Sequence, residues 1–186
     1  MRDRMTGNSG LPIILSALAF AAEKHRDQRR KNAEASPYIN HPIALANMLA
    51  SEGRIDDSVV ICAALLHDTI EDTETTPVEL RAEFGDEIAG IVLEVTDDKL
   101  LAKQDRKRLQ IEHAGSLSQK AKLVKLADKI CNLRDMAQQP PAEWGLSRRQ
   151  EYFDWAKAVV DGLRGTSADL EATFDKVYAM KPAGEG

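Results

Sequence analysis

The sequence has few cysteines, few glycines and prolines, and no excess of basic residues. Cys62 and Cys131 each lie inside an apolar run, so neither a zinc knuckle nor a redox pair is indicated, and a secreted disulfide scaffold would carry more cysteines. The 11 glycines and 7 prolines in 186 residues are too few for a low-complexity or collagen-like chain. We therefore expect a soluble globular protein whose reduced cysteines pack in the core.

A long hydrophobic run is also lacking. The apolar stretch 11–22 follows two arginines, as in a weak signal peptide. It continues directly into Glu23 and Lys24 as one amphipathic helix, and it is too short to span a bilayer. We expect a cytoplasmic protein with no membrane partner. The predicted organisation is a flexible N-terminal tail, one domain and a C-terminal tail, at residues 1–10, 11–181 and 182–186.

Acidic residues outnumber basic ones, 30 to 25, which gives a formal net charge of −5. This balance argues against a general nucleic-acid binder, which usually carries a basic excess. It leaves open a small anionic ligand bound by a local basic patch. The charge is also unevenly placed, because residues 68–98 hold eleven acidic residues against one arginine.

Helical signals run along the whole chain, and no alternating strand pattern or internal repeat stands out. Asp57 is a candidate N-cap, Thr76-Pro77-Val78-Glu79 forms a capping box, and Ser147 with Gln150 forms a second one. The fold class is predicted to be all-α, a single compact multi-helix bundle. The expected helices cover residues 11–31, 42–51, 58–72, 77–84, 86–96, 105–113, 117–136, 147–164 and 167–180.

The most apolar run of the chain, 59–66, leads directly into His67-Asp68 and then Glu71-Asp72. On a helix these four residues share a face at i, i+3 and i+4 spacings. Ionisable groups at the end of a buried helix are costly unless a cation or a polar network compensates them. The pattern indicates a metal site, and the alternative is an ordinary acidic helix end with a core histidine.

His41 and Asp128 can complete such a site. His41 begins a helix beside a polar break, and Asp128 lies at the edge of the apolar stripe of the 117–136 helix, where it could equally pair with a lysine. Two imidazoles and two carboxylates suit Mn²⁺, Fe²⁺ or Zn²⁺, with coordination positions left for water and substrate. Arg134 falls within the same stripe and is expected to be a buried ion-pair partner, for which a carboxylate of this centre is a candidate.

Four stretches, 25–31, 37–42, 64–73 and 126–133, together resemble the HD-domain metal phosphohydrolases. The closer resemblance is to the hydrolase domain of the RelA/SpoT alarmone enzymes, in the small stand-alone form of the metazoan SpoT homologue. It implies an HD-domain helical bundle and an enzyme with one Mn²⁺ ion per site, or another divalent metal. The implied reaction is the 3′-pyrophosphohydrolysis of ppGpp or pppGpp to GDP or GTP and pyrophosphate.

The resemblance also assigns roles to single residues. It implies Glu71 and Asp72 as the pair that orients or activates water, and Tyr38 as a further contact. The segment between Lys31 and Tyr38 is longer than in the large bifunctional enzymes, and 186 residues leave no room for their synthetase. The implied metal ligands are His41, His67, Asp68 and Asp128. The implied substrate contacts are Arg30 and Lys31 beside the base and phosphates, and Asn132 at the nucleoside.

Two basic clusters could provide a cationic rim for a highly charged nucleotide. Each could also be an ordinary solvated face. We expect Lys99, Arg106 and Lys107 to reach the substrate, His25 to make structural hydrogen bonds, and His113 to lie at the surface. The clusters are Lys24, Arg26, Arg29, Arg30 and Lys31, and Lys99, Lys103, Arg106, Lys107 and Arg108.

Two other functions remain open from the sequence. The same pocket could hydrolyse another 2′- or 3′-phosphorylated nucleotide such as NADPH. Alternatively, the chain could be a non-catalytic helical module that binds an alarmone or holds a metal. The paired Glu71 and Asp72 argue against the second alternative, because binding alone does not require them. No nucleic-acid partner is expected, and the sequence does not give the oligomeric state.

Overall fold

The computed structural model describes residues 10–32 and 34–184. The outer parts of the predicted tails, 1–9 and 185–186, lie outside the described residues, and the division into tails and domain stays a prediction. Within the described ranges the regular structure is helical, and extended pairing is limited to one antiparallel bridge between Arg29 and Pro37. In this part of the chain no helix combines the length and apolarity that a membrane crossing requires.

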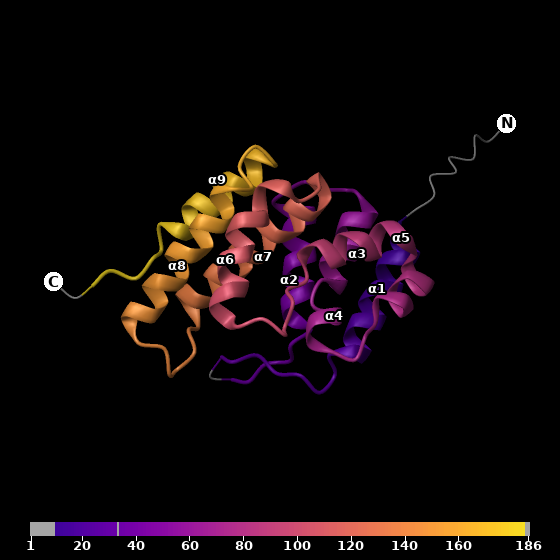
Figure 1. The fold of residues 1–186 in the computed structure, drawn as a ribbon, viewed down its shortest axis with the longest axis horizontal. Coiled ribbons are helices and arrows are strands. Elements are labelled where there is room, and N and C mark those ends of the chain that lie inside the picture. The colour runs from indigo at the N-terminus through magenta and orange to yellow at the C-terminus, as the bar shows by residue number, and fades with distance from the viewer. Residues whose placement is uncertain (1–9, 33, 185–186) are drawn as a thin grey trace.

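The helices form one elongated bundle, with α1 and α5 toward one end and α8 and α9 toward the other (Figure 1). This arrangement confirms the all-α prediction. The elements are α1 (Leu11–Lys24), α2 (Asn40–Ser51), α3 (Ser58–Leu66), α4 (Thr69–Asp72), α5 (Pro77–Val95), α6 (Lys103–His113), η1 (Ala114–Ser116), α7 (Gln119–Gln138), α8 (Leu146–Asp161) and α9 (Ala168–Tyr178).

Helix α3 is central because it is apolar on all sides. Every residue from Val60 to Leu66 is buried, and α3 contacts α1, α2, α5 and α7. Asp57 caps its first turn, as predicted, by accepting a hydrogen bond from the Val59 N–H at 2.9 Å. Full burial of a large aliphatic side chain contributes about 1.5–3 kcal/mol. The burial of α3 therefore fixes the place where the next residues, His67 and Asp68, emerge.

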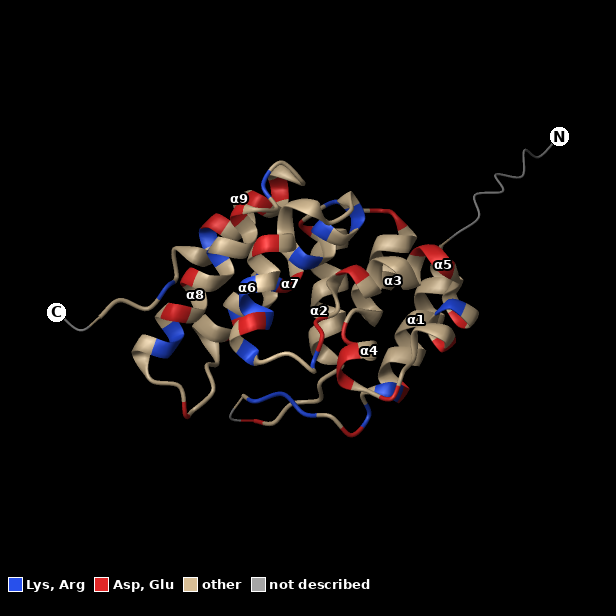
Figure 2. Ribbon diagram, viewed as in Figure 1, with Lys and Arg blue, Asp and Glu red and all other residues tan. Residues whose placement is uncertain are grey.

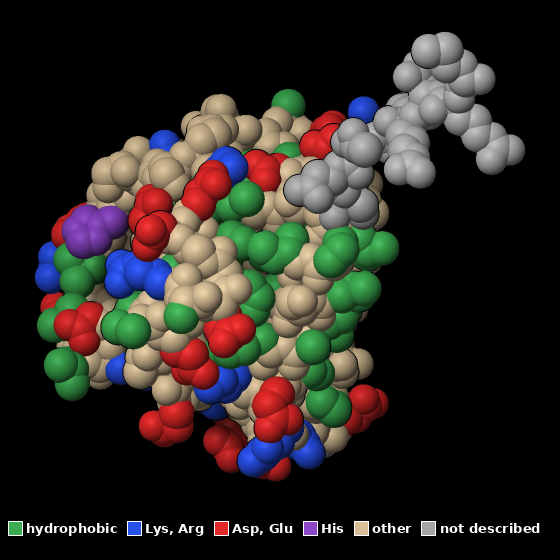
Figure 3. Space-filling view, turned by 90° about the vertical axis from the view of Figure 1, so that its right-hand side faces the viewer, with side chains coloured by type: hydrophobic (Ala, Val, Ile, Leu, Met, Phe, Trp, Pro, Cys, Tyr) green, Lys and Arg blue, Asp and Glu red, His purple; other side chains and the backbone are tan. Residues whose placement is uncertain are grey.

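Helix α1 packs against α3 from outside and is only partly buried. Its fully buried side chains are those of Ala17 and Ala21, whereas Leu11, Ile13 and Leu15 are exposed. Figure 3 views the molecule from this end and shows apolar side chains at the surface. The cysteines are buried and free, as the sequence predicts.

The first helix is shorter than predicted. It ends at Lys24 instead of residue 31, because the chain turns at His25, whose carbonyl accepts from the Gln28 N–H at 3.0 Å. The segment then folds back on itself, with Tyr38 N–H donating to Gln28 O at 3.0 Å. The basic residues 29–31 therefore lie on a loop and not on a helix.

The predicted capping box at Ser147 is wrong. Gly145 is the N-cap of α8, and Ser147 is already helical. Its hydroxyl donates to Glu151 Oε1 at 3.1 Å instead of capping a backbone N–H. The capping box at Thr76 is confirmed on the Thr76 side, where the hydroxyl accepts from the Glu79 N–H at 3.1 Å.

The predicted break between 84 and 86 is confirmed as a kink inside α5. Gly85 has φ 82° and ψ 170°, a region that essentially only glycine adopts. We expect Gly85→Ala to lower the free energy of unfolding by about 1–3 kcal/mol, through backbone strain. An added Cβ would meet nothing within 4 Å, so a steric clash contributes nothing. Urea unfolding followed by circular dichroism measures the change.

Gly90 provides the matched control, because it lies in the same helix and its Cβ position is also open. Gly90→Ala is expected to raise the free energy of unfolding by roughly 0.5–1 kcal/mol, since alanine loses less backbone entropy in a helix. Equal effects of the two substitutions would contradict the assigned strain at Gly85.

Candidate metal centre

Three helices bring the four predicted metal ligands together. His41 lies in the first turn of α2, His67 and Asp68 follow α3, and Asp128 lies on α7. Asp128 Oδ1 is 3.3 Å from His41 Nε2 and 3.9 Å from His67 Nε2. Candidate ligand atoms of these three residues lie within 4.8 Å of one another. Asp68 joins them through Oδ2, which is 2.9 Å from His67 Nε2.

The hydrogen bonds of His67 leave one ring nitrogen free for a ligand. Its Nδ1 lies 2.8 Å from the carbonyl oxygen of Ala64, which can only accept, so Nδ1 carries a proton. Its Nε2 is buried and makes no hydrogen bond of good geometry to the described residues, although Asp68 Oδ2 lies 2.9 Å away. An orphaned buried nitrogen beside two carboxylates fits a divalent cation, and carboxylate with imidazole is a donor set that such ions prefer.

Without a cation, a proton compensates the anionic charge. Burial opposes charge on His67, but the carboxylates of Asp68 and Asp128 outweigh it and raise the pKa of His67 to about 9. Burial also opposes ionisation of Asp128, yet Lys129 and His41 hold the pKa of that carboxyl well below its usual range. A metal ion must therefore displace a proton from this site as it binds.

Glu71 and Asp72 face the same cavity, which has a volume of about 200 Å³. They come from the short helix α4, one turn after Asp68. Glu71 Oε2 accepts from the Asp97 N–H at 3.2 Å. Burial, followed by the nearby charge of Asp68, raises the pKa of Glu71, so this side chain is a stronger base than a free glutamate.

Two of the predicted substrate contacts instead hydrogen-bond to two of the predicted metal ligands. The Tyr38 hydroxyl donates to Asp68 Oδ2, and Asn132 Nδ2 donates to Asp128 Oδ1 at 2.5 Å. Burial, with the charge of Asp68 next, raises the pKa of Tyr38 far above its ordinary value. Tyr38 therefore stays a hydrogen-bond donor, and both residues orient the carboxylates that face the metal position.

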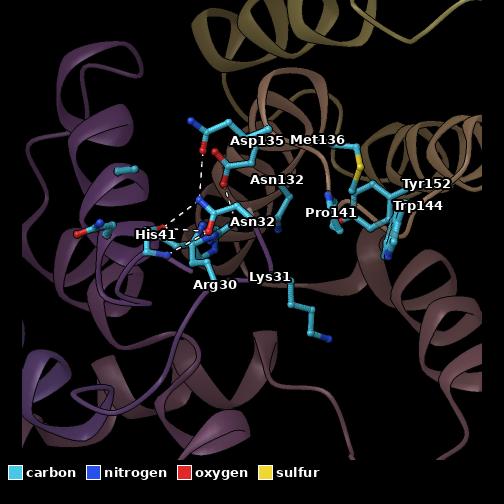
Figure 4. A pocket seen from close by; sticks show the side chains of 14 residues that line it. Arg30, Lys31, Asn32, His41, Asn132, Asp135, Met136, Pro141, Trp144 and Tyr152 are labelled. Carbon is cyan, nitrogen blue, oxygen red and sulfur yellow. Dashed lines mark hydrogen bonds and ion pairs between the residues drawn. The ribbon is translucent and has the colours of Figure 1, made fainter. Parts of the chain in front are cut away.

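A second cavity of about 320 Å³ adjoins the metal centre at His41 and Asn132. Figure 4 shows Arg30, Asn32 and His41 toward one side of it and Trp144 and Tyr152 toward the other. Arg30 pairs with Asp135 at 2.5 Å. The cavity combines a polar wall with an aromatic one, which suits a flat ring that carries polar edges. Lys31, Met136, Gln139 and Pro141 also line it.

The second basic cluster is divided between two places. Lys99 pairs with Asp72, and Arg106 Nη1 lies 3.6 Å from Glu71 Oε1. Lys107 instead lies over the ring of Trp155, 4.8 Å from its centre, in a third cavity of about 500 Å³. Figure 2 shows basic residues on α6 and acidic residues on α4. Arg108 points away and pairs with Glu112 at 2.9 Å.

The first basic cluster contributes fewer residues than its charge suggests. Arg30 and Lys31 line the 320 Å³ cavity. Lys24 pairs with Glu79 at 2.7 Å, and Arg26 pairs with Glu23. The rim around the candidate site is therefore formed by part of each cluster.

Arg134 is not part of the metal centre, so the carboxylate suggested for it was wrong. Both of its terminal nitrogens donate to the carboxylate of Glu52, each at 2.7 Å, at the end of α2. This side chain is about a third exposed. An arginine within an apolar stripe can bury its aliphatic stem while its charged end reaches the surface.

Sequence reasoning left open a lysine partner for Asp128, which the structure confirms, but it did not identify the two buried lysines of α7. Lys125 Nζ donates to Val95 O at 2.9 Å, and Lys129 Nζ lies 3.1 Å from Asp128 Oδ2. Both line the metal cavity. Their i, i+4 spacing, with Lys129 next to Asp128, was the sequence signal that could have indicated that both face the metal cavity. The aromatic wall, Trp144 and Tyr152, was also missed, although Trp144 follows the helix-breaking pair Pro140-Pro141 and Tyr152 lies on the next helix, α8.

Comparisons with known proteins agree with this geometry. The HD domain family matches residues 17–153. The guanosine-3′,5′-bis(diphosphate) 3′-pyrophosphohydrolase MESH1 of Xenopus tropicalis is 56% identical over 171 residues, which cover 92% of this chain and 96% of that protein. The human MESH1 is 53% identical over 168 residues, which cover 90% of this chain and 94% of that protein.

A solved structure gives the same result. It is that of a metazoan ortholog of SpoT that hydrolyzes ppGpp, and it matches with a TM-score of 0.87 at 50% identity, covering 89% of this chain and 93% of that chain. These findings confirm the predicted resemblance. The chain belongs to the HD domain family and, within it, to the MESH1 proteins.

Proposed function

We propose that this protein is a metal-dependent 3′-pyrophosphohydrolase of ppGpp and pppGpp. The observation that carries the proposal is the buried centre of His41, His67, Asp68 and Asp128, with Glu71, whose pKa is raised, at its edge. The relatives are named for this substrate, and the chain matches nearly their whole length, which supports the same substrate here. A small nucleotide is thus the proposed binding partner, and the buried free cysteines support a reducing, cytoplasmic location.

Manganese is the proposed metal, with one ion per site. His41, His67, Asp68 and Asp128 would hold it, and such mixed imidazole and carboxylate donors suit Mn²⁺. When bound, the metal lowers the pKa of a coordinated water and polarises a phosphoryl oxygen. Tyr38 and Asn132 keep two of the ligands oriented through the hydrogen bonds described above.

Glu71 and Asp72 are the proposed pair that orients water and moves its proton. The oxygen of water forms a bond to the phosphorus attached to the ribose 3′-oxygen, and the bond between that phosphorus and the 3′-oxygen breaks. The proton released from water passes to the Glu71 carboxylate, and the 3′-oxygen takes up a proton from solvent as the GDP or GTP product forms. The raised pKa of Glu71 suits this role, because a general base works best when its pKa is near the working pH.

The basic and aromatic residues around the centre are the proposed substrate contacts. The 320 Å³ cavity with Trp144 and Tyr152 would take the base and ribose, with Arg30 and Lys31 at its polar wall. Tyr38 and Asn132 lie where the metal cavity meets the loop that carries Arg30 and Lys31. Lys99 and Arg106, beside Asp72 and Glu71, would provide positive charge toward the phosphates, and Lys107 would add charge from the neighbouring 500 Å³ cavity, which Arg106 also lines.

The test is hydrolysis of ppGpp by the purified protein with added Mn²⁺. We expect one pyrophosphate and one GDP for each ppGpp consumed, measured by ion-pair chromatography. The same protein is then given NADPH, because the aromatic side chains of the cavity, Trp144 and Tyr152, can stack on an adenine as well as on a guanine. Release of phosphate from NADPH with no attack on ppGpp would favour the alternative substrate class.

A His67→Ala variant controls for contaminating enzymes, and its preparation should release no pyrophosphate. Binding of ppGpp without turnover by the wild type would contradict the proposed enzyme and favour a binding module.

A further inference from the structure

His25 is a buried histidine that the metal centre does not use. It is the first residue after α1, and only 1% of its surface is exposed. We propose that His25 is a positioning residue, which acts through Gln28 to orient the carboxylate of Asp72. This inference rests on the proposed function, because it assumes that Asp72 takes part in orienting water.

The direction of the hydrogen bonds can be deduced atom by atom. His25 Nδ1 lies 2.6 Å from Gln28 Oε1. An amide oxygen accepts and never donates, so Nδ1 must carry the proton. This bond fixes which end of the Gln28 amide faces the histidine, and it turns the NH₂ group toward Asp72. There Gln28 Nε2 donates to Asp72 Oδ2 at 3.2 Å.

The other oxygen of Asp72 has a more exposed partner. Oδ1 pairs with Lys99, whose side chain is 49% exposed. Lys99 is also a proposed contact of the substrate phosphates, and an ammonium drawn toward a phosphate weakens its hold on Asp72. The buried side of the carboxylate, bound to Gln28, then keeps Asp72 in place during the reaction. This is the reason for a rigid support behind Gln28.

His25 supports the neighbouring loop as well. Its ring packs against the ring of Tyr38, with centroids 4.9 Å apart, and the Tyr38 hydroxyl donates to Asp68. The backbone of Gln28 is fixed on both sides, because its N–H donates to His25 O and its carbonyl accepts from the Tyr38 N–H, both at 3.0 Å. One imidazole thus lies behind two carboxylates of the site.

The second ring nitrogen argues against a merely space-filling role. His25 Nε2 is buried and has no hydrogen-bond partner among the described residues. A buried polar atom without a partner costs free energy, which a leucine of similar size would avoid. The Nδ1 bond to Gln28 is the interaction that accounts for an imidazole at this position.

The experiment compares His25→Leu with His25→Asn in the Mn²⁺-loaded protein. We expect His25→Leu to lower kcat for ppGpp by about tenfold to a hundredfold, as is usual for residues that hold the side chains of a metal site in place. KM and metal content should change little. His25→Asn should recover most of kcat, because its amide N–H occupies the place of Nδ1–H. His113→Leu, an exposed control, should behave as wild type.

Gln28→Leu should lose as much as His25→Leu, and the double variant should lose no more than either, because both act through one bond. A raised KM with unchanged kcat, or additive losses, would overturn the proposal and leave His25 a support of the loop.

Nuclear magnetic resonance of the Gln28 side-chain amide tests the bond without any substrate. Its two protons should exchange slowly in wild type and in His25→Asn, and quickly in His25→Leu. Fast exchange in the wild type overturns the inference whatever the substrate is. If the amide behaves as expected but no pyrophosphate is released, the proposed function fails and the positioning of Asp72 stands.

Discussion

Asp128→Asn is expected to lose both the bound metal and the hydrolase activity. Asp128 lies between the two imidazoles, 3.3 Å from His41 Nε2 and 3.9 Å from His67 Nε2, and an uncharged amide oxygen is a much weaker ligand than its carboxylate. Because the metal supplies several kcal/mol of transition-state stabilisation, we expect the rate to fall by at least about a thousandfold. Elemental analysis and pyrophosphate release measure the two losses.

The same substitution should destabilise the fold, because it removes the carboxylate beside the buried ammonium of Lys129, 3.1 Å away. Breaking a buried pair from one side costs about 3–5 kcal/mol. The double variant Asp128→Asn with Lys129→Met separates the two effects, since it should recover stability but neither metal nor activity. Asp161→Asn on the surface of α8 is the matched control. Retention of metal and full rate by Asp128→Asn would contradict the ligand set.

Glu71→Gln is expected to keep the metal and lose the reaction. Glutamine keeps an oxygen that can accept the Asp97 N–H, which Glu71 Oε2 now accepts at 3.2 Å, but it cannot take a proton from water. Loss of a general base lowers kcat by about 10²- to 10⁴-fold. Single-turnover kinetics with ppGpp and Mn²⁺ measure the change, and metal content should equal that of wild type.

The pH dependence provides a second test of Glu71. Burial and the charge of Asp68 raise its pKa, so the ionised base is lost at a higher pH than for a free glutamate. The wild-type rate should therefore fall as the pH falls through that raised pKa, and the small residual rate of Glu71→Gln should lack this dependence. Glu74→Gln, an exposed acid of the same segment, is the control. Equal rates of Glu71→Gln and wild type would contradict the role of Glu71.

Much of the fold could be predicted because its signals are local. The cap at Asp57, the break at Gly85 and the apolar run of α3 depend on residues close in sequence. The end of the first helix could not be predicted, because residues 25–31 are compatible with a helix in their propensities. The chain leaves the helix there through contacts of His25 and Gln28 with Tyr38 and Asp72, which are distant in sequence.

The charged residues show the same division. Both basic clusters are evident in the sequence, but it cannot tell which lysine faces the site and which pairs at the surface. Lys107 packs against Trp155, whereas Arg108, its neighbour, pairs with Glu112. Neighbours on a helix point about 100° apart, so the packing of the helix decides which of them faces inward.

The sequence by itself predicted the all-α fold class and proposed four donor residues with the pair at Glu71 and Asp72. The fold class follows from local helical signals and the grouping of His67, Asp68, Glu71 and Asp72 from their close spacing, which are properties of short segments, whereas His41 and Asp128 were added from distant segments with the help of the family resemblance. The tertiary structure decided that His41, from α2, meets Asp128, from α7, around the end of α3. It also decided which groups lie buried, and therefore which pKa values shift. Both depend on packing between distant segments, because the distance and the dielectric environment between charges are set only when the helices come together.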